Sequence, residues 1–276
     1  MSHKDQTTLE QQLGEELSKV SVWLSDNRLS LHLGKTEAIL MGSEPRLKKV
    51  RELRIQLGPV MLKQVKTVKY LGCVLDDKLF GEAMASQVRA KVSTRTRYLA
   101  SKARFLDRES LKLLANSLVL CHLDYGSIAW FERLSKESKE TKGKLQTSQN
   151  KLMRVVLGLG PHSHIGKSQF QELNWLPVEA RVTQLRLNVV HNVFTHRAPI
   201  YLQDQFTLVS ESHNLRTRGS VANFRLPILH TKLGHSTFIY KGVKDWNDLP
   251  IAIKQSPSLP SFKKNVKKWL MERVAA

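Results

Sequence analysis

The spacing of apolar residues divides the chain into an early part with mixed patterns and a later part with helical periodicity. Between Leu9 and Leu24, apolar residues recur every three or four positions, which predicts one amphipathic helix that ends at Ser25–Asn27. Short alternating or β-branched runs follow and predict strands, with turns at Gly34–Lys35 and Gly58–Pro59. The predicted strands are LSLHL (29–33), TEAILMG (36–42), RIQLG (54–58), VMLKQV (60–65) and TVKYLGCVLD (67–76), the first two forming a hairpin.

After Phe80 the apolar period of about 3.6 residues persists and predicts a series of helices separated by Gly, Pro and Asp breakers. The predicted helices are 82–105, 108–122, 144–157, 167–173, 178–196 and 261–274, the last capped by Ser261, and the charged stretch 136–144 is predicted to be a loop. The pattern therefore predicts an α+β fold that is mainly α, in which a small antiparallel sheet precedes a helical bundle and a basic C-terminal region. The predicted domains are 1–78, 79–160 and 161–276.

Charge narrows the choice of partner. The chain has 44 Lys and Arg against 24 Asp and Glu, a formal net charge of +20 and a pI near 10.1. Such a strongly positive surface favours a polyanion, with nucleic acid as the natural partner. A basic protein that binds nucleic acid only nonspecifically, or that binds an anionic membrane surface, remains the alternative.

Cysteine spacing and hydropathy indicate the compartment. Cys73 and Cys121 are far apart and neither has a partner at zinc-ligand spacing, which excludes a zinc knuckle and favours a reducing compartment. Cys121 is expected in the core. The apolar runs are too short to span a membrane and the N-terminal residues are too polar for a secretory signal. We expect an intracellular protein, in the nucleus or the cytoplasm, with no membrane partner.

The motifs that suggest catalysis are incomplete. Asp76–Asp77 resembles a polymerase metal pair, but no acidic strand precedes it to complete a two-metal site, so it is interpreted as a strand end and a helix N-cap. The Gly-Lys-Thr and Gly-Lys-Ser tripeptides lack the first glycine of a phosphate loop. His162 and His164 have no further ligand nearby. The sequence therefore predicts no metal site and no catalytic residue from these patterns.

The basic segment SQVRAKVSTRTRYLASKAR (86–104) is the clearest binding signal. Its apolar residues, including Val88, Val92, Leu99 and the following Phe105, are spaced to pack on one face, so the cations are left to follow a phosphate backbone. The candidate nucleic-acid-binding residues are Arg89, Lys91, Arg95, Arg97, Lys102 and Arg104. A solvated charged face is the alternative. The C-terminal helix, with Lys263, Lys264, Lys267, Lys268 and Trp269, is a weaker second candidate.

Taken in order, several segments resemble one family. The segments are VSVWLSDNRLSLHLGKTEAILMG, VKYLGCVLDDKL, LVLCHLDYGSIAW, LNWLPVEAR, APIYL, NLRTRG, WNDLP and SLPSFKKNVKKWL. Together they resemble the C-terminal half of the reverse transcriptase of non-LTR retrotransposons, in the Jockey-like and related lineages. The resemblance covers nearly the whole chain after about residue 9.

The resemblance implies the end of a polymerase palm, a thumb and a C-terminal domain. It implies that Tyr70, Leu71 and Gly72 form a primer-grip-like turn and that Lys35 lies near the incoming nucleotide as a weak catalytic candidate. It also implies that Arg89–Arg97 belongs to the first thumb helix, which follows the minor groove of the template–primer duplex. The metal-binding aspartates of the family, which use Mg²⁺, would lie upstream of Leu9, so Asp76–Asp77 is not that pair.

The expected function follows from this resemblance and from the charge. We expect a truncated, retrotransposon-derived fragment of the RNA-directed DNA polymerase family that lacks the catalytic aspartates, needs no cofactor by itself and does not polymerise alone. It is expected to bind RNA or DNA, including an RNA–DNA primer–template, with little sequence preference, and to accept the missing polymerase portion as a partner. A protein-interaction module and a nonfunctional relic without a nucleic-acid role remain the alternatives.

Overall fold

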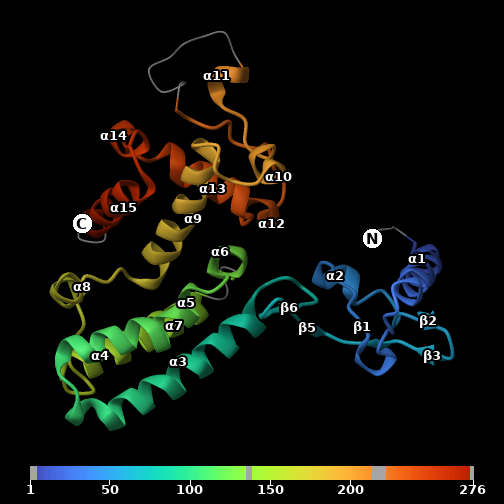
Figure 1. The fold of residues 1–276 in the computed structure, drawn as a ribbon, viewed down its shortest axis with the longest axis horizontal. Helices are drawn as coiled ribbons and strands as arrows, with labels where there is room; N and C mark the ends of the chain where they lie inside the picture. Colours follow the sequence, from blue (N-terminus) through green and yellow to red (C-terminus); the bar gives the residue numbers. More distant parts are fainter. Residues whose placement is uncertain (1–4, 135–138, 213–221, 274–276) are drawn as a thin grey trace. The chain divides into compact units, whose positions relative to one another are not determined.

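The structure is a computed structural model that describes residues 5–134, 139–212 and 222–273 (Figure 1). The chain divides into two compact units, Met1–Met84 and Ala85–Ala276. It is mainly helical with a few short strands, which confirms the predicted α+β, mainly α class. The predicted division into three domains stays a prediction.

The first unit contains one long helix, several very short strands and two short helical segments. Its elements are α1 (Gln6–Asp26), the 3-10 helix η1 (Leu33–Lys35), β1 (Glu37–Ala38), α2 (Glu44–Leu47), β2 (Gln56–Leu57), β3 (Val60–Met61), β4 (Lys63–Gln64), β5 (Thr67–Tyr70) and β6 (Cys73–Asp76). Helix α1 begins where the Asp5 carboxylate accepts a hydrogen bond of 2.8 Å from the Thr8 amide. The predicted first helix is therefore confirmed.

Strand pairing in this unit follows the local turns only in part. Strands β2 and β3, which flank the predicted turn at Gly58–Pro59, form an antiparallel hairpin in which Gly58 adopts a positive φ of 56°. Strand β1 pairs in parallel with β4, so the hairpin predicted across Gly34–Lys35 is wrong. Residues 29–33 form no strand because Leu31 and Leu33 pack into a small core around Ile55 instead of entering a ladder.

The ionic contact of Glu10 fixes α1 on this small core. The buried Glu10 carboxylate accepts two hydrogen bonds from the Arg51 guanidinium, at 2.8 and 2.7 Å, and a third from the Arg54 amide at 2.8 Å. A carboxylate taken out of water needs such partners. The contact joins α1 to the loop that precedes β2.

Among the described residues of the second unit, the regular secondary structure is helical, apart from one isolated bridge between Leu208 and Phe224. Its elements are α3 (Glu82–Lys102, which starts in the first unit), η2 (Ala103–Phe105), α4 (Arg108–Ala115), the π-helix η3 (Asn116–Leu120), α5 (Cys121–Asp124), α6 (Ser127–Trp130), η4 (Phe131–Arg133), α7 (Lys139–Leu157), α8 (Lys167–Leu173), α9 (Val178–Phe194), α10 (Ile200–Gln203), α11 (Val209–Ser212), α12 (Lys232–His235), α13 (Phe238–Asn247), α14 (Ile251–Lys254) and α15 (Leu259–Arg273). Every helix predicted between residues 82 and 196 is present.

Three local predictions in this unit are wrong. Helix α7 begins at Lys139, so the predicted loop is helical over 139–144, while 136–138 lie outside the described residues. A 2.5 Å ion pair between Glu140 and Lys144 stabilises the first turns of α7. The helix continues through Gly143, which lies in open space. Helix α15 begins at Leu259, and the Ser258 hydroxyl rather than Ser261 acts as its cap. Cys121 is exposed and does not belong to the core.

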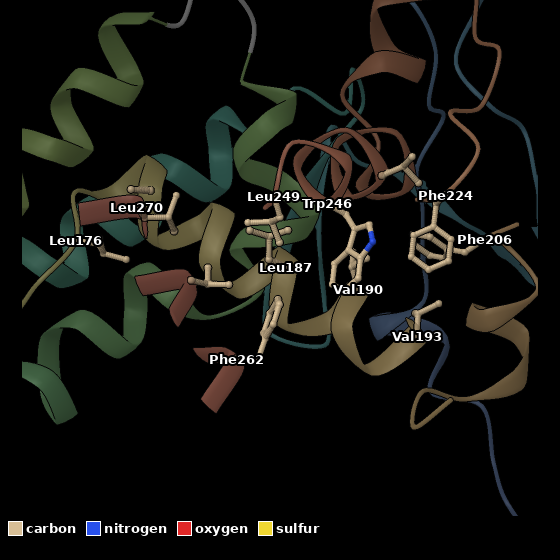
Figure 2. Close-up of a cluster of buried hydrophobic side chains, with 13 residues drawn as sticks. Leu176, Leu187, Val190, Val193, Phe206, Phe224, Trp246, Leu249, Phe262 and Leu270 are labelled. Atoms are coloured by element: carbon tan, nitrogen blue, oxygen red, sulfur yellow. The ribbon is translucent and has the colours of Figure 1, made fainter. Parts of the chain in front are cut away.

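The main core of the second unit lies where α9, α13 and α15 meet (Figure 2). Aromatic rings concentrate at its centre: Trp246 has its ring centroid 5.0 Å from that of Phe194 and 5.8 Å from that of Phe262. The imidazole of His191 lies 4.2 Å from the Phe262 centroid. The apolar faces of three helices separated in sequence are therefore buried against one another.

Burial of His191 makes the second unit sensitive to acid. Burial lowers the pKa of His191, whereas in the unfolded chain a histidine titrates near its ordinary value of about 6.5. Below that pH the unfolded chain takes up a proton that the folded chain resists, so the free energy of unfolding should fall as pH drops through about 6.5. Urea titrations between about pH 7.5 and pH 5 should show a weaker pH dependence for His191→Phe than for the parent chain. Burial also lowers the pKa of His122, but His122 is present in both proteins and contributes equally to their pH dependence. If the free energy of unfolding changed with pH equally in both proteins, His191 would not be the source of the acid sensitivity.

Candidate nucleic-acid interface

Helix α3 separates packed from charged positions as the sequence predicts. Val88, Val92 and Leu99 are buried, and all six predicted cations between Arg89 and Arg104 are exposed. Phe105 differs from the prediction, since its ring is exposed and lies under the Arg104 guanidinium at 4.6 Å. Arg104 is thus partly engaged by a cation–π contact outside the helix itself.

The α3 cations form two rows and not one. Because each residue turns an α-helix by about 100°, Arg89 and Arg97 lie on one flank of the buried face, with Ser93 between them. The remaining α3 cations lie on the opposite flank; they are Lys91, Arg95 and Lys102. The two rows therefore face different surroundings.

The row containing Arg89 and Arg97 borders a groove shared with α7. The groove has a volume of about 470 Å³ and is lined by Arg89, Ser93, Thr96, Arg97, Lys144, Thr147, Ser148 and Lys151. Its lining therefore contains four cations and four hydroxyl groups and no carboxylate. Lys144 pairs with Glu140, whereas no carboxylate of the described residues lies within ion-pair distance of Arg97 or Lys151. This arrangement suits an anion with several oxygen acceptors.

One buried hydroxyl in the groove lacks a partner. Thr96 is only 7% exposed, and its Oγ1 has no hydrogen-bond partner among the described residues. The hydroxyls of Thr147 and Ser148 donate to backbone carbonyls one turn earlier, at 2.8 and 2.9 Å. Among the buried hydroxyls of the lining, Thr96 is therefore the one whose hydrogen is left for an entering anion. A buried hydroxyl without a partner carries a cost that such a ligand would remove.

The α7 side of the groove was missed in the sequence. Lys144, Thr147 and Lys151 are spaced by three and four residues and share one helix face. The sequence contains this spacing, but the predicted break at Gly143 and the predicted loop before it place Lys144 at a helix end and not on a helix face. A helix continued through Gly143 would have exposed the pattern.

The predicted primer-grip-like turn is the apex of the β5–β6 hairpin in the first unit. Tyr70 pairs with Cys73, and the two-residue loop between them has positive φ at both Leu71 (46°) and Gly72 (83°). Positive φ at both positions is typical of a type I′ turn, which glycine tolerates and leucine resists. The side chain of Leu71 is 76% exposed and that of Tyr70 is also exposed. The turn presents two large side chains at its tip.

Lys35 and Asp76–Asp77 also belong to the first unit. Lys35 ends η1 and is exposed. The Asp76 carboxylate accepts hydrogen bonds from the amides of Phe80 and Gly81, both at 2.8 Å, just before α3. Asp76 therefore ends β6, as predicted, but the predicted helix N-cap is wrong, because α3 begins at Glu82 and the two amides that Asp76 binds belong to the residues before the helix. No group of three or more His, Cys, Asp or Glu side chains suited to a metal ion occurs within residues 5–134, 139–212 and 222–273.

Comparisons with protein-family models, with curated proteins and with solved structures found no match to this chain. In the described part of the chain, no helix combines the length and the apolar character needed to cross a bilayer. A ligand class for the groove between α3 and α7 is therefore inferred from the side chains of its lining.

Proposed function

We propose that the chain is the palm-edge, thumb and C-terminal portion of a non-LTR retrotransposon reverse transcriptase and binds RNA or DNA through the α3–α7 groove. The observation that carries the binding proposal is a groove with four cations, an unpartnered Thr96 hydroxyl and no carboxylate in its lining. The order of family-like motifs along the sequence supports the reverse-transcriptase origin. An RNA–DNA primer–template is the natural ligand of such a thumb.

The contacts available in the groove favour binding with little sequence preference. Lys and Arg contact phosphates, and phosphate contacts position a nucleic acid without specifying its bases. Arg89 and Arg97 are eight residues apart, so they are separated by about 12 Å along α3. A duplex strand carries one phosphate per about 3.4 Å of its axis, so the groove can follow three or four successive phosphates.

Polymerisation would need groups beyond those of the groove. Phosphoryl transfer by this family uses carboxylates that hold Mg²⁺, and cations alone cannot replace them. We therefore propose that the chain by itself binds a primer–template without extending it. A polymerase segment that carries the metal-binding aspartates is the partner that would restore extension.

Binding to a labelled RNA–DNA primer–template over a salt series tests the proposal. Replacement of Arg97, Lys144 and Lys151 by glutamine should weaken binding to all sequences alike and should reduce the slope of log K against log salt by about 2–3 units, since each lost phosphate contact removes about 0.9. The matched control replaces the same number of cations on the other flank of α3, Lys91, Arg95 and Lys102. Equal losses in the two variants would mean that total charge, and not the groove, governs binding.

A parallel sample with Mg²⁺ and nucleotides tests for extension. Primer extension by the chain alone would contradict the proposal that the chain binds a primer–template without extending it. Absence of binding at physiological salt would contradict the nucleic-acid function and would favour a protein-interaction module, for which the exposed Val22 and Trp23 of α1 are an obvious surface.

A further inference from the structure

A second, smaller cavity lies in the second unit, away from the residues of the α3–α7 groove. It has a volume of about 350 Å³, and its walls come from α4, η3, α5, α7, the segment after α8, α9 and α15. Its polar lining includes Lys112, Asp124, Trp175, Arg181 and Lys267. The proposed function uses none of these side chains. A volume near 350 Å³ is in the range of small-molecule sites.

The charges that line the cavity do not balance. Asp124 is engaged by Arg181, with 2.7 Å between Oδ2 and Nη2 and 3.1 Å between Oδ1 and Nε, so these two charges offset each other. Lys112 has only a 3.9 Å contact with the highly exposed Glu109. Lys267 has no carboxylate within ion-pair distance in the described part of the chain, and burial, followed by the charges of Arg181 and Lys112, lowers its pKa. Among the lining residues, two positive charges are therefore left without a carboxylate partner.

A buried donor in the same cavity also lacks a partner. Trp175 is 6% exposed, and its indole Nε1 has no acceptor among the described residues. The two glutamines of the lining are occupied, since Gln149 donates to the Leu176 carbonyl and Gln184 accepts from Arg181 and donates to the Lys263 carbonyl. A buried indole N–H normally finds an acceptor. The Trp175 N–H is therefore the donor that an entering ligand would satisfy.

The rest of the lining is apolar. The side chains of Leu120, Leu123, Leu173 and Val182 contribute to the walls. One wall includes the π-helix η3, and π-helical turns occur frequently at functional sites. A bare inorganic ion would leave these walls without contacts, whereas an anion attached to an apolar or aromatic body would use both parts of the cavity.

We propose that this cavity binds a phosphate monoester that carries a small aromatic or apolar group. The dianionic phosphate balances the two lysines of the lining that no lining carboxylate pairs with, Lys112 and Lys267, and the ester body contacts the apolar wall, with one oxygen accepting from the Trp175 N–H. Such a group is supplied either by a free small phosphate monoester or by the 5′-phosphate end of a nucleic-acid strand. The site is distinct from the groove and does not depend on its function.

Calorimetric titration of the full chain with phenyl phosphate, inorganic phosphate and phenol tests the proposal. Phenyl phosphate should bind at least tenfold more tightly than either of the other two probes, because only it supplies both charge and ring. Lys267→Met should weaken phenyl phosphate binding at least tenfold, and Trp175→Phe, which keeps an aromatic ring but removes the N–H, should weaken it severalfold. The matched control is Lys263→Met, because Lys263 lies on the same helix, is exposed and does not line the cavity.

The same variants separate loss of binding from loss of folding. Lys267→Met removes a half-buried, uncompensated cation, so without ligand it should melt at a temperature equal to or higher than that of the parent chain. Oligonucleotides with and without a 5′-phosphate distinguish the two sources, since a strand end would show a preference that Lys267→Met abolishes. Equal affinity for phenol and phenyl phosphate, or equal effects of Lys267→Met and Lys263→Met, would overturn the proposal whatever the groove variants do.

Discussion

Replacing Arg186 by methionine should lower the free energy of unfolding of the second unit by about 3–5 kcal/mol, the usual cost of removing one partner from a buried ion pair. The Arg186 side chain on α9 is almost fully buried, with the residue 1% exposed. Its Nε and Nη2 lie 2.7 and 2.6 Å from the Asp245 carboxylate on α13, and its Nη1 lies 3.1 Å from the Glu132 carboxylate on η4. One guanidinium thus joins three segments.

The two carboxylates would not lose the same support. Burial opposes ionisation of Glu132, but Arg186, Lys142 and Lys241 together hold the pKa of Glu132 below its ordinary value. Without Arg186 the two lysines remain, at 3.7 and 3.5 Å. Asp245 is different, because burial already raises its pKa against the effect of Arg186. We therefore expect Asp245 to account for most of the loss.

Urea unfolding followed by circular dichroism measures the effect. Arg197→Met, at an exposed position just after α9, is the matched control and should change stability by no more than about 0.5 kcal/mol. Adding Asp245→Leu to Arg186→Met should recover part of the loss, because a buried pair replaced by apolar residues is often neutral. If Arg186→Met behaved like Arg197→Met, the ion-pair cluster would not stabilise this unit.

The contrast between Arg186 and α3 explains how far the sequence can predict this fold. Helices α3, α8 and α9 were predictable because their apolar periodicity is contained within each segment. The partners of Arg186 lie 54 and 59 residues away, so no local pattern marks it as buried. For the same reason the turn that joins β2 and β3 was predicted, whereas the parallel β1–β4 pair was not.

The two candidate sites also differ in how much of each a local sequence pattern can predict. The α3 row of the groove was visible as a cationic helix, whereas the α7 row was hidden by a predicted break at Gly143. The cavity around Lys267 has no local signature at all, since its lining comes from segments spread between Lys112 and Lys267. In the sequence, Lys267 was one of four lysines on a basic helix. Only packing distinguishes it from its neighbours.

Truncation of Trp246 to alanine should be the other severe change, at about 3–5 kcal/mol. Trp246 is 0% exposed and lies within the core cluster of α9, α13 and α15 (Figure 2). Its ring centroid is 5.0 Å from that of Phe194, 5.9 Å from that of Phe224 and 5.8 Å from that of Phe262. Alanine would leave a cavity that these rings cannot close without leaving their own packing.

A hydrogen bond adds to the packing loss and can be measured separately. The Trp246 indole N–H donates to the Ala222 carbonyl at 2.8 Å, and this buried bond fixes the segment after residue 221 on α13. Trp246→Phe keeps an aromatic ring in the core but leaves that carbonyl without its donor. We therefore expect the free energy of unfolding of this variant to lie between those of the alanine variant and the parent chain. Tyr201→Ala, at an exposed position, is the control and should be close to neutral. A typical domain is stable by about 5–15 kcal/mol, so the loss expected for Trp246→Ala is a large part of the total. If the Trp246→Ala chain were as stable as the Tyr201→Ala chain, the aromatic cluster would not stabilise the second unit.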